Sequence, residues 1–328
     1  MRRALRKGGY VLLIAAAFAA GWVPLPFFSF GAGPAREIVP LIHVKGPPTY
    51  GSSGRLVMTT IRFTQVTALG ALVAWIDPEE AVVDEEVVYP PGLSPPEEVR
   101  RGTSQMDQSK IDAAAVVLSE VTDYPREHGP GALVEFVGPG CPADGRLFPG
   151  DLIVRIEGRR VGSSREASRL IDAVRADEPV EFRIEADGQE NDVLVTRGSC
   201  PGSDEPLIGI VLVQPFPFEI TIESGEVGGP SAGLMWAVGL YDLLTRSDLT
   251  AGRTIAGTGS IDLDGNVGPI GGILDKVVAA RDARADIMLV PRDNLSELRD
   301  VDTGALRLIP VSTFDEAVEA LTSSQTPT

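Results

Sequence analysis

The chain has 328 residues, of which 43% are hydrophobic, and a formal net charge of −17. This length suffices for two or more domains, and the hydrophobic fraction suffices for a full-sized core. Nucleic-acid binding needs a basic surface that faces the phosphates, so the strong acidity argues against a nucleic-acid partner.

The N-terminus carries four basic residues in its first seven positions, followed by an apolar run from about residue 8 to residue 30. A helix of this length crosses a hydrocarbon core of about 30 Å. The flanking basic residues predict a cytoplasmic N-terminus and an extracytoplasmic bulk. We therefore expect residues 1–33 to form a basic tail and a single-pass transmembrane anchor in the cell membrane. A cleaved secretory signal is the alternative, but Pro24 and Pro26 interrupt the run and no small-x-small site follows at once, which favours an uncleaved anchor.

Two cysteines, Cys141 and Cys200, are too few for a disulfide framework, and the chain has no CxxC pair that would indicate zinc. An extracytoplasmic location would permit a disulfide between them, and the sequence leaves this open. Calcium binding at Asp262 and Asp264 is weakly indicated, because the rest of an EF-hand loop is missing and a hairpin turn explains both acids. We expect no metal and no cofactor.

Residues 34–125 are expected to form an extracytoplasmic segment of strands and a helix. A linker rich in Pro, Gly and Ser leads to residue 55, and the alternation over 56–67 predicts a strand. Apolar positions at helical spacing across 106–121 predict an amphipathic helix that packs on another element.

Residues 126–200 read as a compact unit with strands at 132–137, 180–185 and 192–196 and a helix over 164–175. The stretch PADGRLFPGDLIVRIEGRRV lies at its centre, and the unit resembles a PDZ domain of the bacterial type. A small α/β domain without a ligand is the plainer alternative.

The resemblance implies a groove between the edge of the 133–137 strand and the helix, where an extended peptide would add as a strand. The loop at 128–131 would cap a C-terminal carboxylate with its N–H groups. The groove residues implied are Gly131, Ala132, Leu133 and Val134.

Residues 201–325 show strands that alternate with helices, beginning with a strand at 207–214, and this predicts an α/β domain within an α+β chain. The motif Gly228-Gly229-Pro230-Ser231-Ala232-Gly233 precedes an apolar helix. Proline is favoured at the first helical position, so Ser231 is expected in the first turn. There the free N–H groups of the helix could stabilise an oxyanion.

A Ser-His-Asp triad that contains this serine is excluded. The G-x-S-x-G nucleophile elbow of α/β-hydrolases needs a histidine after the serine, and no histidine follows His128. A carboxylate or a lysine then remains as the base. Lys276 is the only lysine in the C-terminal region and has small and branched apolar neighbours. Burial lowers a lysine pKa from its usual value of about 10.4, so this lysine could act as the base. Most lysines on amphipathic helices are simply solvated, and the pairing with the serine motif distinguishes this one.

The motifs together resemble the proteolytic domain of the Lon proteases. They are Gly229-Pro230-Ser231-Ala232-Gly233, Thr258-Gly259-Ser260, Asp264-Gly265-Asn266 and Pro269-Ile270-Gly271-Gly272 with Lys276. The resemblance implies that Ser231 is the nucleophile, Lys276 the general base, and Thr258 a support for the lysine amine. Gly229, Pro230 and Ala232 would shape the turn around the serine.

Two features depart from the usual Lon pattern. Ser260 replaces the acid of T-G-E, and Val227-Gly228 replace the charged residues before the serine motif. No G-x-x-x-x-G-K-[ST] motif occurs, so no ATP-driven unfolding is expected. The order of anchor, PDZ unit and Lon-type unit is similar to that of membrane-tethered, ATP-independent Lon-like proteases of bacteria.

The resemblance implies an endopeptidase that cuts unfolded or flexible extracytoplasmic polypeptides, with peptide termini at the PDZ groove and a homo-oligomeric, hexameric ring. The alternative is a catalytically idle PDZ scaffold at the membrane whose Lon-like domain only oligomerises. The strand and helix of residues 54–121 also look like the opening of a Lon proteolytic domain, so we expect the PDZ unit to be inserted within that domain.

Overall fold

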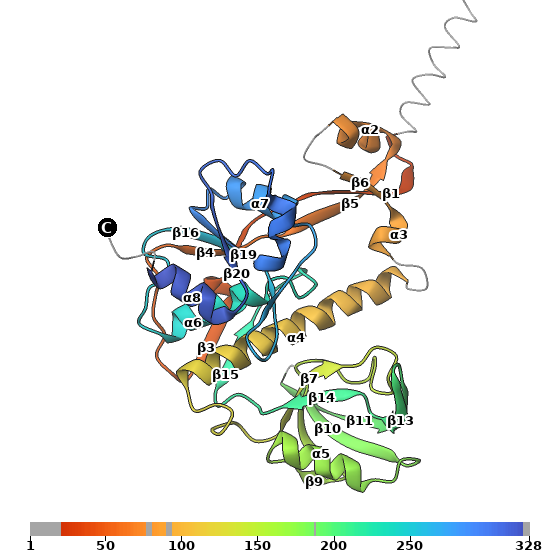
Figure 1. Cartoon of the computed structure of the whole chain (residues 1–328). Helices are drawn as coiled ribbons and strands as arrows, with labels where there is room; N and C mark the ends of the chain where they lie inside the picture. The colour runs from red at the N-terminus through yellow and green to blue at the C-terminus, as the bar shows by residue number, and fades with distance from the viewer. Residues whose placement is uncertain (1–20, 77–80, 90–93, 187, 324–328) are drawn as a thin grey trace, which may run out of the picture.

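A computed structural model describes residues 21–76, 81–89, 94–186 and 188–323 (Figure 1). A core domain occupies the middle of the molecule, with a small N-terminal unit at one end and the PDZ-like unit at the other. The long helix α4 runs between the core domain and the PDZ-like unit.

The core domain is built on a five-stranded sheet in the order β2-β4-β16-β19-β20. Four strands run parallel, and β2 at the edge is antiparallel to β4. The strands are β2 (Arg36–Glu37), β4 (Arg55–Met58), β16 (Thr254–Gly257), β19 (Ile287–Pro291) and β20 (Arg307–Val311).

Helices cover both faces of this sheet, because successive side chains of a strand point to opposite faces. Leu56 and Met58 of β4 pack in the cluster that contains α6 (Gly233–Leu244) and α8 (Phe314–Ser323). Val57 between them packs in the cluster on the other face. That cluster contains α7 (Ile273–Asp282) and the 3-10 helix η2 (Arg292–Leu298).

Chain segments from both sides of the PDZ-like unit build the core domain. Strand β4 pairs in parallel with β16, and β3 (Ile42–Lys45) pairs with β15 (Glu219–Ile222). The indole Nε1 of the buried Trp236 on α6 lies 3.4 Å from the sulfur of Met106 on α4. Strands β3 and β4 and helix α4 therefore pack with the C-terminal region, which is the arrangement that an inserted PDZ unit requires. Short elements complete the domain: η1 (Val39–Leu41), β17 (Ser260–Ile261) and β18 (Val267–Gly268).

Helix α4 (Pro95–Val121) begins well before the expected residue 106. Ser94 precedes it, and the Ser94 N–H donates to Glu97 Oε2 at 2.7 Å, as in a capping box. Pro95 occupies the first position, where a missing N–H costs nothing. The extra turns are mostly polar and none of their residues is buried, so the apolar spacing did not reveal them.

The PDZ-like unit has a sheet in the order β11-β10-β8-β7-β14, with the short β9 beside β8. Helix α5 (Ser164–Ala173) packs its buried residues into the core of this unit. A disulfide joins Cys141 to Cys200, the pairing that the sequence left open. The strands are β7 (Ala132–Val137), β8 (Leu152–Ile156), β9 (Arg159–Arg160), β10 (Pro179–Ala186), β11 (Gln189–Thr196), β12 (Gly198–Cys200), β13 (Ser203–Leu207) and β14 (Ile210–Val213).

The N-terminal unit is a three-stranded sheet with two short helices. It contains β1 (Pro24–Ala32), β5 (Ile61–Thr67), β6 (Ala81–Asp84), α2 (Ala68–Ile76) and α3 (Glu85–Val88). The expected strand over 56–67 is thus two strands, β4 and β5, in different sheets.

The transmembrane helix expected within residues 1–33 is wrong where it overlaps β1. Prolines 24 and 26 cannot continue a helix, and they begin a strand whose partners are β5 and β6. Residues 1–20 lie outside the described residues. Within the described ranges, no helix is both long enough and apolar enough to cross a bilayer.

A buried carboxyl pair joins α4 to the PDZ-like unit. Asp112 of α4 and Glu135 of β7 are each about nine-tenths or more buried, and Gln108 Nε2 donates to Glu135 Oε1 at 2.7 Å. Burial, followed by the charge of Glu135 and a hydrogen bond with it, raises the pKa of Asp112 to about 8, and Asp262 adds further repulsion. Asp112 is therefore protonated at neutral pH and can share its proton with Glu135.

This pair should make stability depend on pH. An unfolded aspartate has a pKa of about 3.9, so between about pH 4 and pH 8 the folded chain binds a proton that the unfolded chain has lost. The free energy of unfolding should therefore fall as the pH rises through that window. Asp112→Asn should flatten this fall in urea denaturation between about pH 6 and pH 8. A variant with the same pH dependence as the parent would contradict the shared proton.

Candidate active site

Ser231 lies in a tight turn that precedes α6. Gly229 has a φ of +82°, a left-handed backbone that favours glycine. Helix α6 begins at Gly233, so Ser231 and Pro230 precede the helix rather than forming its first turn as expected. The apolar residues of α6 are buried in the core domain, which anchors the turn from its C-terminal side.

Helix α4 is hydrogen-bonded to the same turn at the residues before Ser231. The Gly229 N–H donates to the Gly102 carbonyl at 2.8 Å, and Ser109 Oγ donates to the Pro230 carbonyl at 3.1 Å. A Cβ on Gly228 would lie 3.3 Å from the Gly102 carbonyl carbon, so two backbones meet here. Neither Gly102 nor Ser109 was predicted from the sequence. A glycine inside a long helix was the available signal, since it weakens a helix and is often kept for a close approach.

Lys276 projects from the first half of α7 into the protein interior and is 2% exposed. Gly272, with a φ of +67°, starts this helix. Lys276 Nζ lies 2.7 Å from Ser231 Oγ and 3.1 Å from Thr258 Oγ1. Burial lowers the pKa of Lys276 to about 8, so an appreciable fraction of the amine is neutral near physiological pH.

Thr258 sets the direction of these hydrogen bonds. Its hydroxyl donates to the Ser231 carbonyl at 3.0 Å, so its proton is already used and its oxygen accepts from Lys276 Nζ. A neutral Lys276 that donates to Thr258 can direct its lone pair at the Ser231 hydroxyl. The Gly259 N–H also donates to the Ser231 carbonyl, at 2.9 Å, and fixes the serine backbone.

The three side chains meet at the carboxyl end of a parallel strand. Thr258 directly follows β16, while Ser231 precedes α6 and Lys276 lies on α7, and these two helices pack on opposite faces of the sheet. Open α/β sheets commonly place their ligands at this end of the strands. The structure thus brings together Ser231, Lys276 and Thr258, with Gly229, Pro230 and Ala232 in the turn around the serine.

The two acids considered for calcium form a hairpin turn instead. Asp262 Oδ1 accepts from the N–H groups of Asp264 and Asn266, at 3.0 and 2.9 Å. Asp262 Oδ2 accepts from the Asn266 side-chain amide at 2.9 Å. A hairpin turn therefore accounts for the hydrogen bonds of Asp262 and Asp264.

The predicted peptide groove along β7 is wrong. Leu133 to Val137 already pair with β14, and Ala132 and Leu133 pair with β8 on the other side. Gly131 packs beside Leu152, and Val134 is fully buried in the domain core. Strand β14, which the sequence analysis assigned to the following domain, occupies the proposed binding edge.

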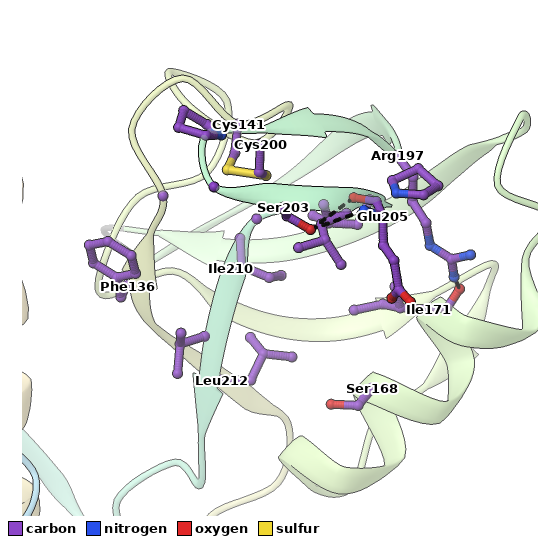
Figure 2. Close-up of a pocket in the computed structure, with 18 of the residues that line it drawn as sticks. Phe136, Cys141, Ser168, Ile171, Arg197, Cys200, Ser203, Glu205, Ile210 and Leu212 are labelled. Atoms are coloured by element: carbon purple, nitrogen blue, oxygen red, sulfur yellow. Dashed lines mark hydrogen bonds between the residues drawn. A yellow bond between two sulfur atoms is a disulfide. The ribbon is translucent and has the colours of Figure 1, made fainter.

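A groove instead lies between β14 and α5 (Figure 2). Strand β14 ends the sheet, and its outer edge pairs with no other described strand. Ile210 and Leu212 of β14 face Ser168 and Ile171 of α5 across a groove of about 870 Å³. The disulfide between Cys141 and Cys200 and the β12–β13 hairpin border one end of it.

Comparisons with known proteins agree with the motifs of the C-terminal region. Residues 220–323 match the family model of the Lon protease (S16) C-terminal proteolytic domain. The Lon protease of Rickettsia bellii is 34% identical over 116 residues, which is 34% of this chain and 15% of that protein. Lon protease 2 of Herpetosiphon aurantiacus is 40% identical over 93 residues, 28% of this chain and 11% of that protein. Lon protease 2 of Bacillus subtilis is 28% identical over 144 residues, 42% of this chain and 25% of that protein.

The chain therefore spans no more than a quarter of the length of these relatives. Among solved structures, the PDZ domain of an SdrC-like protein from Listeria innocua is similar to it at 27% identity and a TM-score of 0.22, covering 25% of this chain and 92% of that structure. The C-terminal region is thus similar to the proteolytic domain of Lon proteases, a class of serine peptidases.

The pKa of Lys276 predicts how Ser231 should react with a fluorophosphonate. Only the neutral amine can take the serine proton, so the labelling rate should rise with pH and level off above about pH 8. Thr258→Val removes the hydroxyl that holds the amine, and one lost hydrogen bond of about 1–1.5 kcal/mol should slow labelling roughly tenfold. Rates measured by mass spectrometry across the pH range would test both effects. Labelling of Ser231 that is insensitive to pH would rule out Lys276 as its base.

Proposed function

We propose that the protein is a serine endopeptidase in which Ser231 and Lys276 form a catalytic dyad. The observation that carries the proposal is a nearly fully buried lysine whose Nζ lies 2.7 Å from a serine hydroxyl. An ordinary surface lysine gains nothing from such a position, because burial penalises its charged form. Perturbed groups of this kind concentrate at catalytic sites.

The geometry supports acyl transfer in two stages. As Ser231 Oγ attacks the peptide carbonyl carbon, neutral Lys276 takes the hydroxyl proton. The ammonium then gives this proton to the leaving amine as the peptide C–N bond breaks, which leaves an ester on Ser231. A water molecule attacks the ester, Lys276 takes a proton from that water, and the proton returns to Ser231 Oγ as the carboxyl product leaves.

Backbone groups beside the serine are available to stabilise the oxyanion. The N–H groups of Ser231 and Ala232 donate to no other described residue, whereas the neighbouring Gly229 and Gly233 N–H groups are both bonded. Free N–H groups at such a turn can hold the negative oxygen of the tetrahedral intermediate. Removal of one such donor in other enzymes costs a factor of about 10²–10³ in rate.

We further propose that the peptidase is ATP-independent and tethered to the membrane from the extracytoplasmic side. The absence of the phosphate-binding motif G-x-x-x-x-G-K-[ST] from the 328 residues supports ATP independence for this chain. The basic first residues and the apolar run that follows support the membrane tether. Its substrates would be unfolded or flexible polypeptides, and a homo-oligomeric ring remains part of the proposal by resemblance to Lon proteases.

The dyad predicts the loss of proteolysis in two variants. Ser231→Ala and Lys276→Ala should each lower cleavage of a fluorescent unfolded polypeptide by at least about 10³-fold, since nucleophile and base are both required. The matched control Lys45→Ala removes a lysine that is 74% exposed and paired with Glu219, and it should cleave normally. Activity should not change when ATP is added. Undiminished cleavage by either purified dyad variant, with the fold retained by circular dichroism, would refute the mechanism.

A catalytically idle scaffold is the competing proposal, and fluorophosphonate labelling separates the two. A scaffold would leave Ser231 unlabelled, because no base would activate it. The arrangement of Lys276 and Thr258 around Ser231 favours the peptidase.

The PDZ-like unit is proposed to receive peptide termini in the groove between β14 and α5. The open edge of β14 offers backbone groups to which an extended peptide could add. The groove volume of about 870 Å³ and the apolar side chains of Ile210 and Ile171 suit a side chain of that peptide.

Filling this groove should block peptide binding. Ser168→Trp places an indole in the groove from α5, whereas the control Arg165→Trp lies on the same helix but outside the groove lining. Fluorescence anisotropy with a library of peptides bearing free C-termini should show at least about tenfold weaker binding for Ser168→Trp only. Equal binding by both variants would place the peptide elsewhere.

A further inference from the structure

Helix α2 of the N-terminal unit exposes four large apolar residues, whereas its Ala74 is buried. Leu69, Leu72, Val73 and Ile76 are each more than half exposed, at 52–72%. Their i, i+3, i+4, i+7 spacing puts them on one face of the helix. Ala74, on the side toward the sheet, is 2% exposed. A helix that faces water normally shows the reverse arrangement, so this apolar stripe needs a non-aqueous neighbour.

The start of the described chain adds to this apolar surface. Trp22 and Val23 are 75% and 56% exposed. Pro24 pairs with Thr67, the residue directly before α2, so residues 22–23 and the start of α2 lie at the same end of the three-stranded sheet. Figure 1 places α2 at the end of the molecule opposite the PDZ-like unit.

The sequence before Pro24 indicates what covers this apolar surface. Residues 8–23 contain no charged side chain and follow a cluster of basic residues, a pattern that suits a bilayer. Trp22 and Val23 are the last residues of that segment, and they lie at the same end of the sheet as the start of α2. Helix α2 itself has no charged residue, so its contact would depend on apolar burial and not on anionic lipid. A tryptophan at the junction fits the headgroup level, where aromatic rings collect.

We propose that α2 lies along the membrane surface with its stripe of Leu69, Leu72, Val73 and Ile76 in the headgroup–acyl boundary. The contact is additional to the N-terminal tether and rests on that part of the proposed function. Two adjacent attachments, one through the segment before Trp22 and one through α2, would fix which way the core domain faces. The PDZ-like unit would then be the part held farthest from the bilayer.

Photo-crosslinking in the full chain tests the contact without disturbing the fold. A diazirine amino acid is placed at Leu72 or, as a matched control, at Leu194 of β11, because these leucines are 52% and 54% exposed. Each protein is reconstituted into phosphatidylcholine vesicles and irradiated, and adducts are identified by mass spectrometry. We expect lipid adducts at position 72 but none at 194, and the same yield in high salt.

Two results would overturn the inference: no lipid adduct at position 72, or adducts at 72 to a second copy of the chain in place of lipid. Flotation of the same vesicles and their extraction with alkaline carbonate measure the tether separately. Protein that floats and resists extraction but gives no adduct at 72 would refute the α2 contact alone. Protein that does not float would refute the proposed tether, and with it the contact that depends on it.

Discussion

The burial of one amine determines how the catalytic region is built. Lys276 is 2% exposed, and its pKa of about 8 follows from that burial alone. Burial of an ammonium costs free energy, and this lowers the pKa of Lys276. The groups around the amine must therefore position it without raising that pKa again. Thr258 and Ser231 do so with neutral hydroxyls. A carboxylate in their place would stabilise the charged form and raise the lysine pKa, which would remove the base.

This constraint extends to the fold, because the three residues come from separate elements. Helix α7 packs on one face of the sheet and α6 on the other, and Thr258 directly follows β16 of that sheet. Helix α4 closes the arrangement by bonding the turn before Ser231 through Gly102 and Ser109. The same helix contacts the PDZ-like unit through Gln108 and the carboxyl pair. One helix therefore contacts both the turn that precedes Ser231 and the PDZ-like unit.

The sequence predicted best where the signal was local or exclusive. Ser231 stands in a six-residue motif, and the scarcity of histidine and lysine together with the resemblance to Lon proteases predicted Lys276 as its partner before any geometry was known. The pairing of β7 with β14 could not be predicted in this way, because the partners are more than seventy residues apart and share no local pattern. The strand itself was expected, but its apolar run fits either domain.

Two other differences have similar causes. An uncharged apolar run reads equally well as a buried strand or a membrane helix, and only the prolines of β1 separated these possibilities. Gly102 and Ser109 act through an approach between distant segments, and the glycine inside α4 is the one local sign of it in the sequence.

The two points where the chain enters and leaves the PDZ-like unit lie side by side. The Tyr124 hydroxyl donates to the Gln214 carbonyl at 2.9 Å, and its ring packs against Phe216 with centroids 5.7 Å apart. A domain joined by a single linker can rotate in all directions. A domain joined by two adjacent segments of the same chain is limited to a hinge motion about the line between those segments. Any approach of the β14 groove toward Ser231 is thereby confined to a single arc.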